Sequence, residues 1–339
     1  MDKAMISNRF KTFAREECKG SCDLYEQLSM KIAEDDYILD ICMHARPGQP
    51  IPNLLFGAVH FLLLQDPNHK LKTFYGSIVS SPNDPEDSFL YFKEFCTKHS
   101  DAIISLLNNK FVQTNEVRRC SYLYPCFCFI SEKAQKPLAL IELGTSAGLQ
   151  LLWDKYGYSY GNDTIYGNPE ADVYVKSAIT GGPSLHSKSP TVVSRTGIDL
   201  HINDLNNPED YLWLMSLIWP SHHERHKLFE AAAKEVRKNH LDMIEGDGVQ
   251  LIPEIVNGIP QNAAICIFHT HVANQLSRDE QSKLLENIRQ IGRQRDVFHL
   301  YNNIQDRYLH LDYYLNGCEH THTIGKTDGH GSWFSWEMA

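Results

Sequence analysis

The sequence has no excess of positive charge and no apolar run long enough to cross a bilayer. Its 339 residues include 32 lysines and arginines against 42 aspartates and glutamates, a net charge of −10. Binding to nucleic acid requires a basic face for the phosphates, so this balance argues against a general nucleic-acid partner. The longest apolar run, residues 54–64, is interrupted by Gly57 and His60 and is shorter than the roughly 20 residues of a membrane-spanning helix. We therefore expect neither a nucleic acid nor a membrane as partner.

The nine cysteines lack the spacing of a zinc site. The close pairs Cys18/Cys22 and Cys126/Cys128 have no second pair at zinc-ligand spacing. The first residues are charged and contain no apolar signal core. These features predict reduced thiols in a cytoplasmic protein.

The composition is that of an ordinary globular protein, and its pattern changes near residue 136. With 42% hydrophobic and 22% charged residues, the chain suits one large or two ordinary domains. Residues 1–135 show helical patterns, and within the apolar segment 53–64 we expect His60 to be a hydrogen-bonded core residue. A polar stretch at 133–136 is typical of a linker, and strands alternate with helices after it. We expect an all-helical N-terminal cap domain over 1–135 and an α/β domain over 136–339.

The α/β part begins with an apolar stretch that ends in small residues. Residues 138–143 have the composition of a buried parallel strand, which breaks at Gly144 and becomes compatible with a helix from Ala147. A strand that turns through small residues into a helix is typical of a nucleotide- or phosphate-binding site, because the helix N-terminus attracts anions. Three interpretations stay open: a cofactor loop bounded by Gly144 and Gly148, a G-x-S-x-G nucleophile elbow at Ser146, and a plain turn without a ligand.

The rest of the domain continues the alternation of strands and helices. Further strands are expected at 191–200, 241–248, 263–268 and 297–301. Helices are expected at 208–219, 221–238, 249–256 and 277–291. The tail alternates around a turn near 327–329, which predicts a terminal β-hairpin.

Two irregular segments flank the predicted cofactor loop. The tyrosine-rich insertion at about 155–190 is long enough to be functional, and we expect it to form an ordered flap over a pocket. The polar segment 113–119 precedes the first strand. It is either a helix cap with a solvated face, or it reaches over the ligand through Asn115, Glu116 or Arg118.

Residues able to bind a ligand stand at the ends of four predicted strands. Glu142 ends the first strand, Asp199 the second and Asp247 the third, and His269 and His271 follow the fourth. In open α/β sheets, ligands bind beyond the carboxyl ends of the strands. A carboxylate at Asp199 can accept both ribose hydroxyls, and one at Asp247 can accept from an adenine amino group.

The order of these motifs resembles the class I S-adenosylmethionine-dependent methyltransferases. The resemblance covers residues 140–339 and is carried by three motifs: Glu142-x-Gly144-x-x-x-Gly148, Gly197-Ile198-Asp199 and Glu245-Gly246-Asp247-Gly248. It implies a Rossmann-like methyltransferase sheet with S-adenosylmethionine as cofactor.

The resemblance also implies a role for each residue of the glycine loop. Gly144, Thr145 and Gly148 would wrap the methionine part of the cofactor. Glu142 would lie near the amino group and the positive sulfonium, where a carboxylate is electrostatically favourable. Ser146 stands where many methyltransferases have glycine, and its side chain narrows the loop.

The remaining roles fall on the other strand ends. Asp199 would hold the ribose and Asp247 the adenine, with Gly248 leaving room for the base. His269 and His271 would serve as the base that takes a proton from the acceptor, because a histidine titrates near neutral pH. The acidic charge and the helical cap domain favour a small molecule as methyl acceptor.

The chain as a whole resembles an uncharacterised, mainly bacterial family, domain of unknown function 2332. The stretches that carry this resemblance are 49–56, 113–116, 142–149, 195–199, 219–220 and 268–269. This family resemblance implies a methyltransferase-like fold and no known reaction. Nothing in the sequence indicates an oligomeric state.

Three alternative functions remain open. A serine hydrolase would use Ser146 as nucleophile, with Asp199 or Asp247 and a histidine such as His269 or His271. A metal-dependent enzyme would combine His-x-His pairs, 269/271 with 320/322, or use the histidines at 310 and 330. A non-catalytic module would bind a nucleotide or metabolite without turnover. The methyltransferase interpretation assigns no residue to a metal ion.

Overall fold

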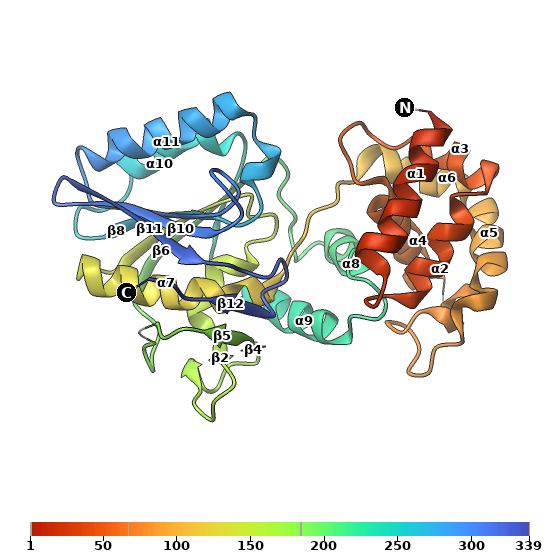
Figure 1. Cartoon of the computed structure of the whole chain (residues 1–339), viewed down its shortest axis with the longest axis horizontal. Coiled ribbons are helices and arrows are strands. Elements are labelled where there is room, and N and C mark those ends of the chain that lie inside the picture. The colour runs from red at the N-terminus through yellow and green to blue at the C-terminus, as the bar shows by residue number, and fades with distance from the viewer. Residues whose placement is uncertain (1, 67, 184, 339) are drawn as a thin grey trace. The chain divides into compact units, whose positions relative to one another are not determined.

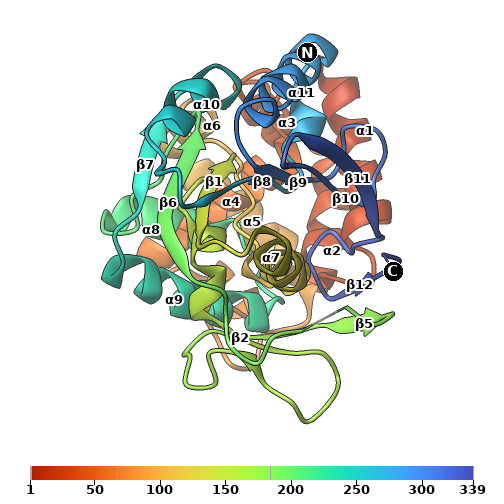
Figure 2. The ribbon, with the colours of Figure 1, turned by 90° about the vertical axis from the view of Figure 1, so that its left-hand side faces the viewer.

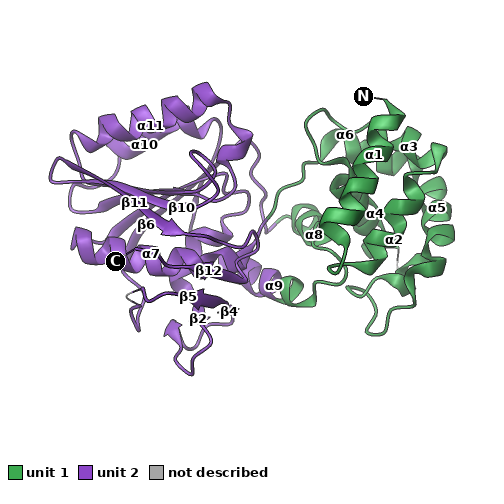
Figure 3. Ribbon diagram, viewed as in Figure 1, with its two compact units in different colours: residues 1–114, 207–227 green, residues 115–206, 228–339 purple. Residues whose placement is uncertain are grey.

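The computed structural model describes residues 2–66, 68–183 and 185–338 and has a mixed α/β fold with two compact units. Unit 1 consists of residues 1–114 and 207–227, and unit 2 consists of residues 115–206 and 228–339 (Figure 3). The division differs from the boundary expected at residue 135. The predicted linker at 133–136 is instead the end of a helix that belongs to unit 2.

Unit 1 contains helices and no strand among its described residues, as expected for the N-terminal part (Figure 1). Its elements are α1 Lys3–Phe13, the π-helix η1 Ala14–Cys18, α2 Asp23–Ile32, α3 Asp36–Cys42, α4 Ile51–Gln65, the 3-10 helices η2 Lys70–Phe74 and η3 Pro85–Asp87, α5 Ser88–Lys98, α6 Ser100–Asn109, α8 Pro208–Ser216 and the start of α9 His223–Lys238. Helix α8 joins this unit because it packs closely on α4. A Cβ atom at Gly57 would lie 2.7 Å from the side chain of Leu217.

The apolar helix α4 forms the centre of unit 1. Its Phe56 is buried and stacks on Tyr25 with a ring separation of 4.0 Å. His60 is fully buried, and its two ring nitrogens contact the Ser216 carbonyl at 2.9 Å and the Ser77 hydroxyl at 2.8 Å. The prediction of a hydrogen-bonded core histidine is confirmed. Among the described residues, no helix has both the length and the apolar character needed to span a bilayer.

Unit 2 is built on a seven-stranded, mostly parallel sheet (Figure 2). The strands lie in the order β11-β10-β9-β8-β1-β6-β7. Their bounds are β1 Leu138–Leu143, β6 Val192–Asp199, β7 Asp242–Glu245, β8 Ala264–His269, β9 Val297–Tyr301, β10 Leu309–Leu315 and β11 Cys318–Gly325. Strands β7, β6, β1, β8 and β9 run parallel, and β10 and β11 are antiparallel additions at one edge. The strands expected from apolar runs are therefore present, within one to three residues of their expected ends.

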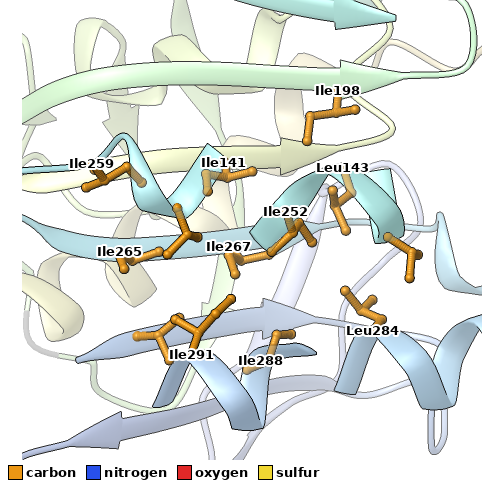
Figure 4. Close-up of a cluster of buried hydrophobic side chains, with 14 of the residues drawn as sticks. Ile141, Leu143, Ile198, Ile252, Ile259, Ile265, Ile267, Leu284, Ile288 and Ile291 are labelled. Carbon is orange, nitrogen blue, oxygen red and sulfur yellow. The ribbon is translucent and has the colours of Figure 1, made fainter. Parts of the chain in front are cut away.

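Helices cover both faces of this sheet (Figures 1 and 2). Helices α10 Gly248–Asn257 and α11 Arg278–Gly292 cover one face, where Ile141, Ile252, Ile267 and Leu284 belong to one buried cluster (Figure 4). Helix α7 Cys120–Ala134, preceded by the 3-10 helix η4 Val117–Arg119, covers the other face. Its Phe127 contacts Phe268 of β8 at 5.3 Å, edge to face. This packing explains why α7 belongs to unit 2.

Two local expectations differ from the structure. The segment after β1 is not an α-helix but the 3-10 helix η5 Leu149–Lys155, which begins after the left-handed Gly148 (φ +77°) and is kinked at Leu152, whose φ/ψ are not helical. The expected turn near 327–329 is present, where Thr327 forms an antiparallel bridge with Phe334, but the larger terminal hairpin joins β10 and β11 through a turn at Asn316–Gly317. Both turn residues have positive φ, as tight hairpin turns require.

The tyrosine-rich insertion is largely ordered in small sheets of its own. It contains β2 Gly157–Ser159, β3 Tyr166–Gly167, β4 Tyr174–Lys176 and β5 Ala178–Thr180. Strand β5 pairs in parallel with β12 Trp333–Ser335 near the end of the chain. Tyr158 and Tyr160 are buried against α7, where their hydroxyls donate to the carbonyls of Trp153 and Ser121. These two tyrosines therefore contribute to packing, and this part of the insertion is ordered as expected, while its role as a flap over a pocket stays a prediction.

Candidate functional site

The sheet reverses its winding direction at β1. The chain runs from β1 to β6 and β7 on one side, then returns to β8 and β9 on the other. In open parallel sheets, the carboxyl ends of the strands at such a reversal form the usual ligand crevice. The candidate site is therefore the region beyond the carboxyl ends of β1, β6 and β8.

The loop after β1 has the tight geometry that its glycines predict. Gly144, Ser146 and Gly148 have φ of +69°, +52° and +77°. A Cβ at Gly144 would overlap Cγ2 of Val272, and one at Gly148 would lie 2.6 Å from Leu241 Cδ1. The loop is thus pressed against neighbouring parts of unit 2, and both glycines are required by conformation and by space.

Most amide groups of this loop already have acceptors within the chain. The amides of Gly144 and Thr145 donate to the Ile198 carbonyl at 2.8 and 3.2 Å, and the Gly148 amide donates to the Thr145 carbonyl at 2.9 Å. The Ser146 amide donates to Asp199 Oδ2 at 2.8 Å. This loop therefore does not present a cluster of free amides that could bind an anion. The helix η5 is too short and irregular for its N-terminus to bind an anion.

Asp199 and Ser146 lie together, and two asparagines contact Ser146. Asp199 Oδ1 also accepts from the His201 amide at 3.1 Å. The Ser146 hydroxyl oxygen accepts hydrogen bonds from the side-chain amides of Asn115 at 3.0 Å and Asn203 at 3.1 Å. Burial raises the pKa of Asp199, and the backbone amides that it accepts act in the opposite direction. Asp199 thus holds the cofactor-type loop to β6.

Glu142 is buried at the end of β1, on the sheet face covered by α7. Thr145 Oγ1 donates to Glu142 Oε2 at 2.7 Å. Burial raises the pKa of Glu142 to about 8, while this hydrogen bond and the more distant Arg119 lower it. At pH 7 the ligand-free protein therefore holds Glu142 mainly in its protonated, neutral form.

Asp247 and Gly248 have clear structural roles. Asp247 is the N-cap of α10, and its Oδ1 accepts the Val249 amide at 2.9 Å. Its Oδ2 accepts the Gln250 side-chain amide at 2.6 Å. A Cβ at Gly248 would lie 2.7 Å from the side chain of Leu143, so glycine is needed for packing on β1.

His269 ends β8 and is 1% exposed. Its Nε2 lies 3.1 Å from Nε2 of His299 on the adjacent strand β9, so one of the two rings donates to the other. Burial lowers the pKa of His269 to about 4 and that of His299 well below its usual range. Both rings are neutral at physiological pH.

His271 lies just beyond β8 in a left-handed conformation with φ +58°. Its amide donates to Asn302 Oδ1 at 2.8 Å, and Nε2 of its ring is buried without a hydrogen-bond partner among the described residues. Burial, assisted by the charge of Arg119, lowers the pKa of His271 to about 4. Arg119 in turn donates to Thr270 Oγ1 at 3.5 Å, which places η4 next to the end of β8.

The predicted residues therefore form two neighbouring groups and one further residue pair, of which Gly248 packs against Leu143 of β1. The first group is Glu142, Gly144, Thr145, Ser146, Gly148 and Asp199, and the second is His269 and His271. The adjacent strands β1 and β8, on which Glu142 pairs with Phe268, bring these groups together. Asp247 and Gly248 stand at the start of α10, with Asp247 engaged in capping.

Sequence reasoning missed several residues of the site. Asn203, Arg119, Thr270 and Asn302 all contact residues of the two groups or each other. Asn203 follows the second strand by four residues, and Thr270 lies between the two predicted histidines, so proximity to a strand end is the signal that finds them. Asn115, proposed as one residue reaching over the site, does contact Ser146.

The hydrolase and metal interpretations lack their required neighbours. Among the described residues, the Ser146 hydroxyl contacts two asparagine amides and no histidine. The strand with His269 lies three strand spacings, about 14 Å, from the strand with His320 and His322. Within residues 2–66, 68–183 and 185–338, no group of three His, Cys, Asp or Glu is placed to hold a metal ion.

Comparison with known proteins gives a family and no closer relative. No curated protein and no solved structure matches the chain. Residues 7–336 match a family described as "Uncharacterized protein conserved in bacteria (DUF2332)". Because the match covers almost the whole chain, the protein belongs to the DUF2332 family.

Proposed function

We propose that unit 2 is a Rossmann-like methyltransferase domain that transfers a methyl group from S-adenosylmethionine to a small molecule. The observation that carries the proposal is the arrangement of Glu142 and Asp199. They end adjacent strands at the reversal point of the sheet and bracket the glycine loop 144–148. This arrangement suits a ligand with a ribose and a positively charged group.

The state of the loop amides favours a sulfonium cofactor over a phosphate-bearing one. The amides of Gly144, Thr145, Ser146 and Gly148 already donate within the chain, so they do not form a phosphate cradle. Glu142 instead places a buried carboxyl group beside the loop. A positive ligand near it would favour the ionised carboxylate.

His271 is a better base candidate than His269. Each ring has one nitrogen without a partner in the described part of the chain, but His271 lies beyond the strand end and is only half-buried, whereas His269 is 1% exposed and bonded to His299. Both are neutral at pH 7 and able to accept a proton, but their low pKa makes them weak bases. Alignment of acceptor and sulfonium would then supply most of the rate acceleration.

A non-catalytic binding module of the same fold is the second candidate, and the burial of His269 favours it. The two candidates differ in turnover: the module would bind the cofactor without forming S-adenosylhomocysteine from any acceptor. For either candidate, the nine cysteines, which are free thiols in the described residues, agree with a proposed cytoplasmic location.

The site is tested by calorimetric titration of S-adenosylhomocysteine into the full chain and into Asp199→Asn. Asparagine keeps one accepting oxygen but loses the carboxylate for the ribose, so we expect at least a roughly tenfold weaker affinity. Glu254→Gln, at an exposed carboxylate on α10, is the control and should bind like the wild type. Equal affinities of all three proteins would remove Asp199 from the ribose site.

A further inference from the structure

Arg119 is a buried cation without an anionic partner among the described residues. It is 7% exposed, although arginine is rarely buried unless it is paired. Its Nε donates to the Gly329 carbonyl at 2.9 Å and its Nη1 to Thr270 Oγ1 at 3.5 Å, and both acceptors are neutral. No carboxylate in the described part of the chain forms an ion pair with its guanidinium. An uncompensated buried charge is costly, so its retention calls for a reason outside folding.

The nearby carboxyl groups do not neutralise this charge. Burial raises the pKa of Glu142 to about 8, so this carboxyl group is mainly protonated at pH 7 and compensates Arg119 only in small part. Glu116 contacts the ring of His330 at 3.3 Å, and Asp328 accepts the Ser332 hydroxyl at 2.7 Å. Each lies beyond ion-pair distance of Arg119.

The guanidinium donates to two acceptors, the Gly329 carbonyl and Thr270 Oγ1, and two buried donors lie in the same region, near the end of β8. Buried atoms without a hydrogen-bond partner among the described residues include the hydroxyl of Tyr122 and the side-chain nitrogen of Asn302. Tyr122 is fully buried and lies within the electrostatic reach of Arg119. Asn302 is 1% exposed, and its oxygen is occupied by the His271 amide, so its nitrogen is the part left to bind.

A close approach of the chain holds this cluster in place. A Cβ at Gly331 would overlap the Arg118 carbonyl oxygen, so only glycine allows the 328–331 turn to pack on η4. The same turn supplies the Gly329 carbonyl that fixes Nε of Arg119. With Nε and Nη1 fixed, the guanidinium is oriented before any ligand arrives, which reduces the entropic cost of binding.

We propose that Arg119, together with Tyr122 and Asn302, forms a binding subsite for the carboxylate group of a small-molecule ligand. A planar carboxylate matches the guanidinium fork and accepts from hydroxyl and amide donors. Next to Glu142 and the end of β8, two sources of a carboxylate are compatible with the subsite: the amino-acid part of S-adenosylmethionine and the methyl acceptor. The identity of the molecule that supplies the carboxylate rests on the proposed function. The existence of the subsite does not.

The subsite is tested by melting the full chain in sodium formate and in sodium chloride at equal ionic strength. We expect formate to raise the melting temperature of the wild type relative to chloride, and Arg119→Met to lose this difference. Methionine approximates the length of the side chain and removes the charge, so the ligand-free variant should melt at the same or a higher temperature. Equal melting of the wild type in the two salts would overturn the proposal. Lower stability of the variant with an unchanged formate effect would also overturn it and make Arg119 structural.

Two further arms keep the test decisive. Where Arg119→Met does not melt cooperatively, Arg119→Lys replaces it and should retain the charge but lose most of the formate effect. Titration of the wild type and the variant with S-adenosylhomocysteine and with 5′-methylthioadenosine, which lacks the amino-acid part, then identifies the source. A roughly tenfold or greater loss for the first ligand alone assigns the carboxylate to the cofactor, and unchanged affinities for both assign it to the acceptor. Failure of both nucleosides to bind the wild type refutes the proposed function, while the formate comparison still decides the subsite.

Discussion

Replacing Glu142 with glutamine should stabilise the ligand-free protein, and increasingly so as the pH rises. The residue is 4% exposed, and burial raises the pKa of its carboxyl group from 4.5 to about 8. The contribution of the buried Glu142 carboxyl group to the unfolding free energy is fully present below pH 4.5, and it is lost as the pH rises through about 8. At pH 7, which is 2.5 pH units above 4.5, keeping the proton costs about 3 kcal/mol at 1.36 kcal/mol per unit. A glutamine side chain at this position avoids this cost, and its oxygen can still accept from Thr145.

The assay is urea denaturation of the wild type and Glu142→Gln at pH 5, 7 and 8.5. We expect the stability advantage of the variant to be below about 1 kcal/mol at pH 5 and about 3 kcal/mol at pH 7. It should be largest at pH 8.5. Glu254→Gln serves as the exposed control and should follow the wild-type profile. Parallel profiles for Glu142→Gln and the wild type would refute the buried, protonated state of Glu142.

Three further substitutions test local roles in the site. Gly144→Ala places a methyl group against Val272 at positive φ, so we expect a loss of roughly 2–4 kcal/mol, partly restored by Val272→Ala; equal losses in both backgrounds would exclude the steric cause. Asp247→Ala should lose about 1 kcal/mol with the α10 cap, and Asp247→Asn less; identical urea midpoints would contradict the capping role. Ser146→Ala should cost about 1–3 kcal/mol, because it removes the acceptor of the Asn203 amide. Ester hydrolysis present in the wild type and absent in Ser146→Ala would restore the nucleophile interpretation.

The strands of the sheet were predictable because parallel strands buried on both faces are nearly continuous apolar runs. Residues 138–143 and 264–269 are buried at every position. The assignment of helices to units was not predictable in the same way. An apolar helix such as α7 has the same sequence pattern whether it packs on a sheet or on other helices, and only the contact of Phe127 with Phe268 decides.

Turn chemistry explains the two local errors. Asn316-Gly317 is a strong hairpin signal, yet the predicted hairpin was centred on the later glycine near 329. After β1, the sequence from Ala147 onward is compatible with a helix, but the structure has a 3-10 helix that starts after the left-handed Gly148 and is kinked at Leu152. A cavity-filling contact is one reason that local sequence does not reveal: a Cβ at Gly148 would lie 2.6 Å from Leu241 Cδ1.

The candidate site was predictable in its position and less so in its chemistry. The rule that ligands bind at strand ends located Glu142, Asp199, His269 and His271 at one edge of the sheet. It did not reveal that Asp247 caps a helix or that His269 pairs with His299, because both depend on neighbours. Arg119 was missed because its burial and its contacts with Thr270 and Gly329 depend on segments far away in the sequence.

The most direct test of the account is calorimetric titration of the wild-type protein with S-adenosylmethionine at pH 7 in two buffers of different ionisation enthalpy. We predict binding at a single site, with release of a proton as the sulfonium favours the ionised form of Glu142. At a hundred times the dissociation constant, the ligand should add about 2.7 kcal/mol to the unfolding free energy and raise the melting temperature by a few degrees. No heat of binding in either buffer, together with an unchanged melting temperature, would contradict the proposal of a methyltransferase site.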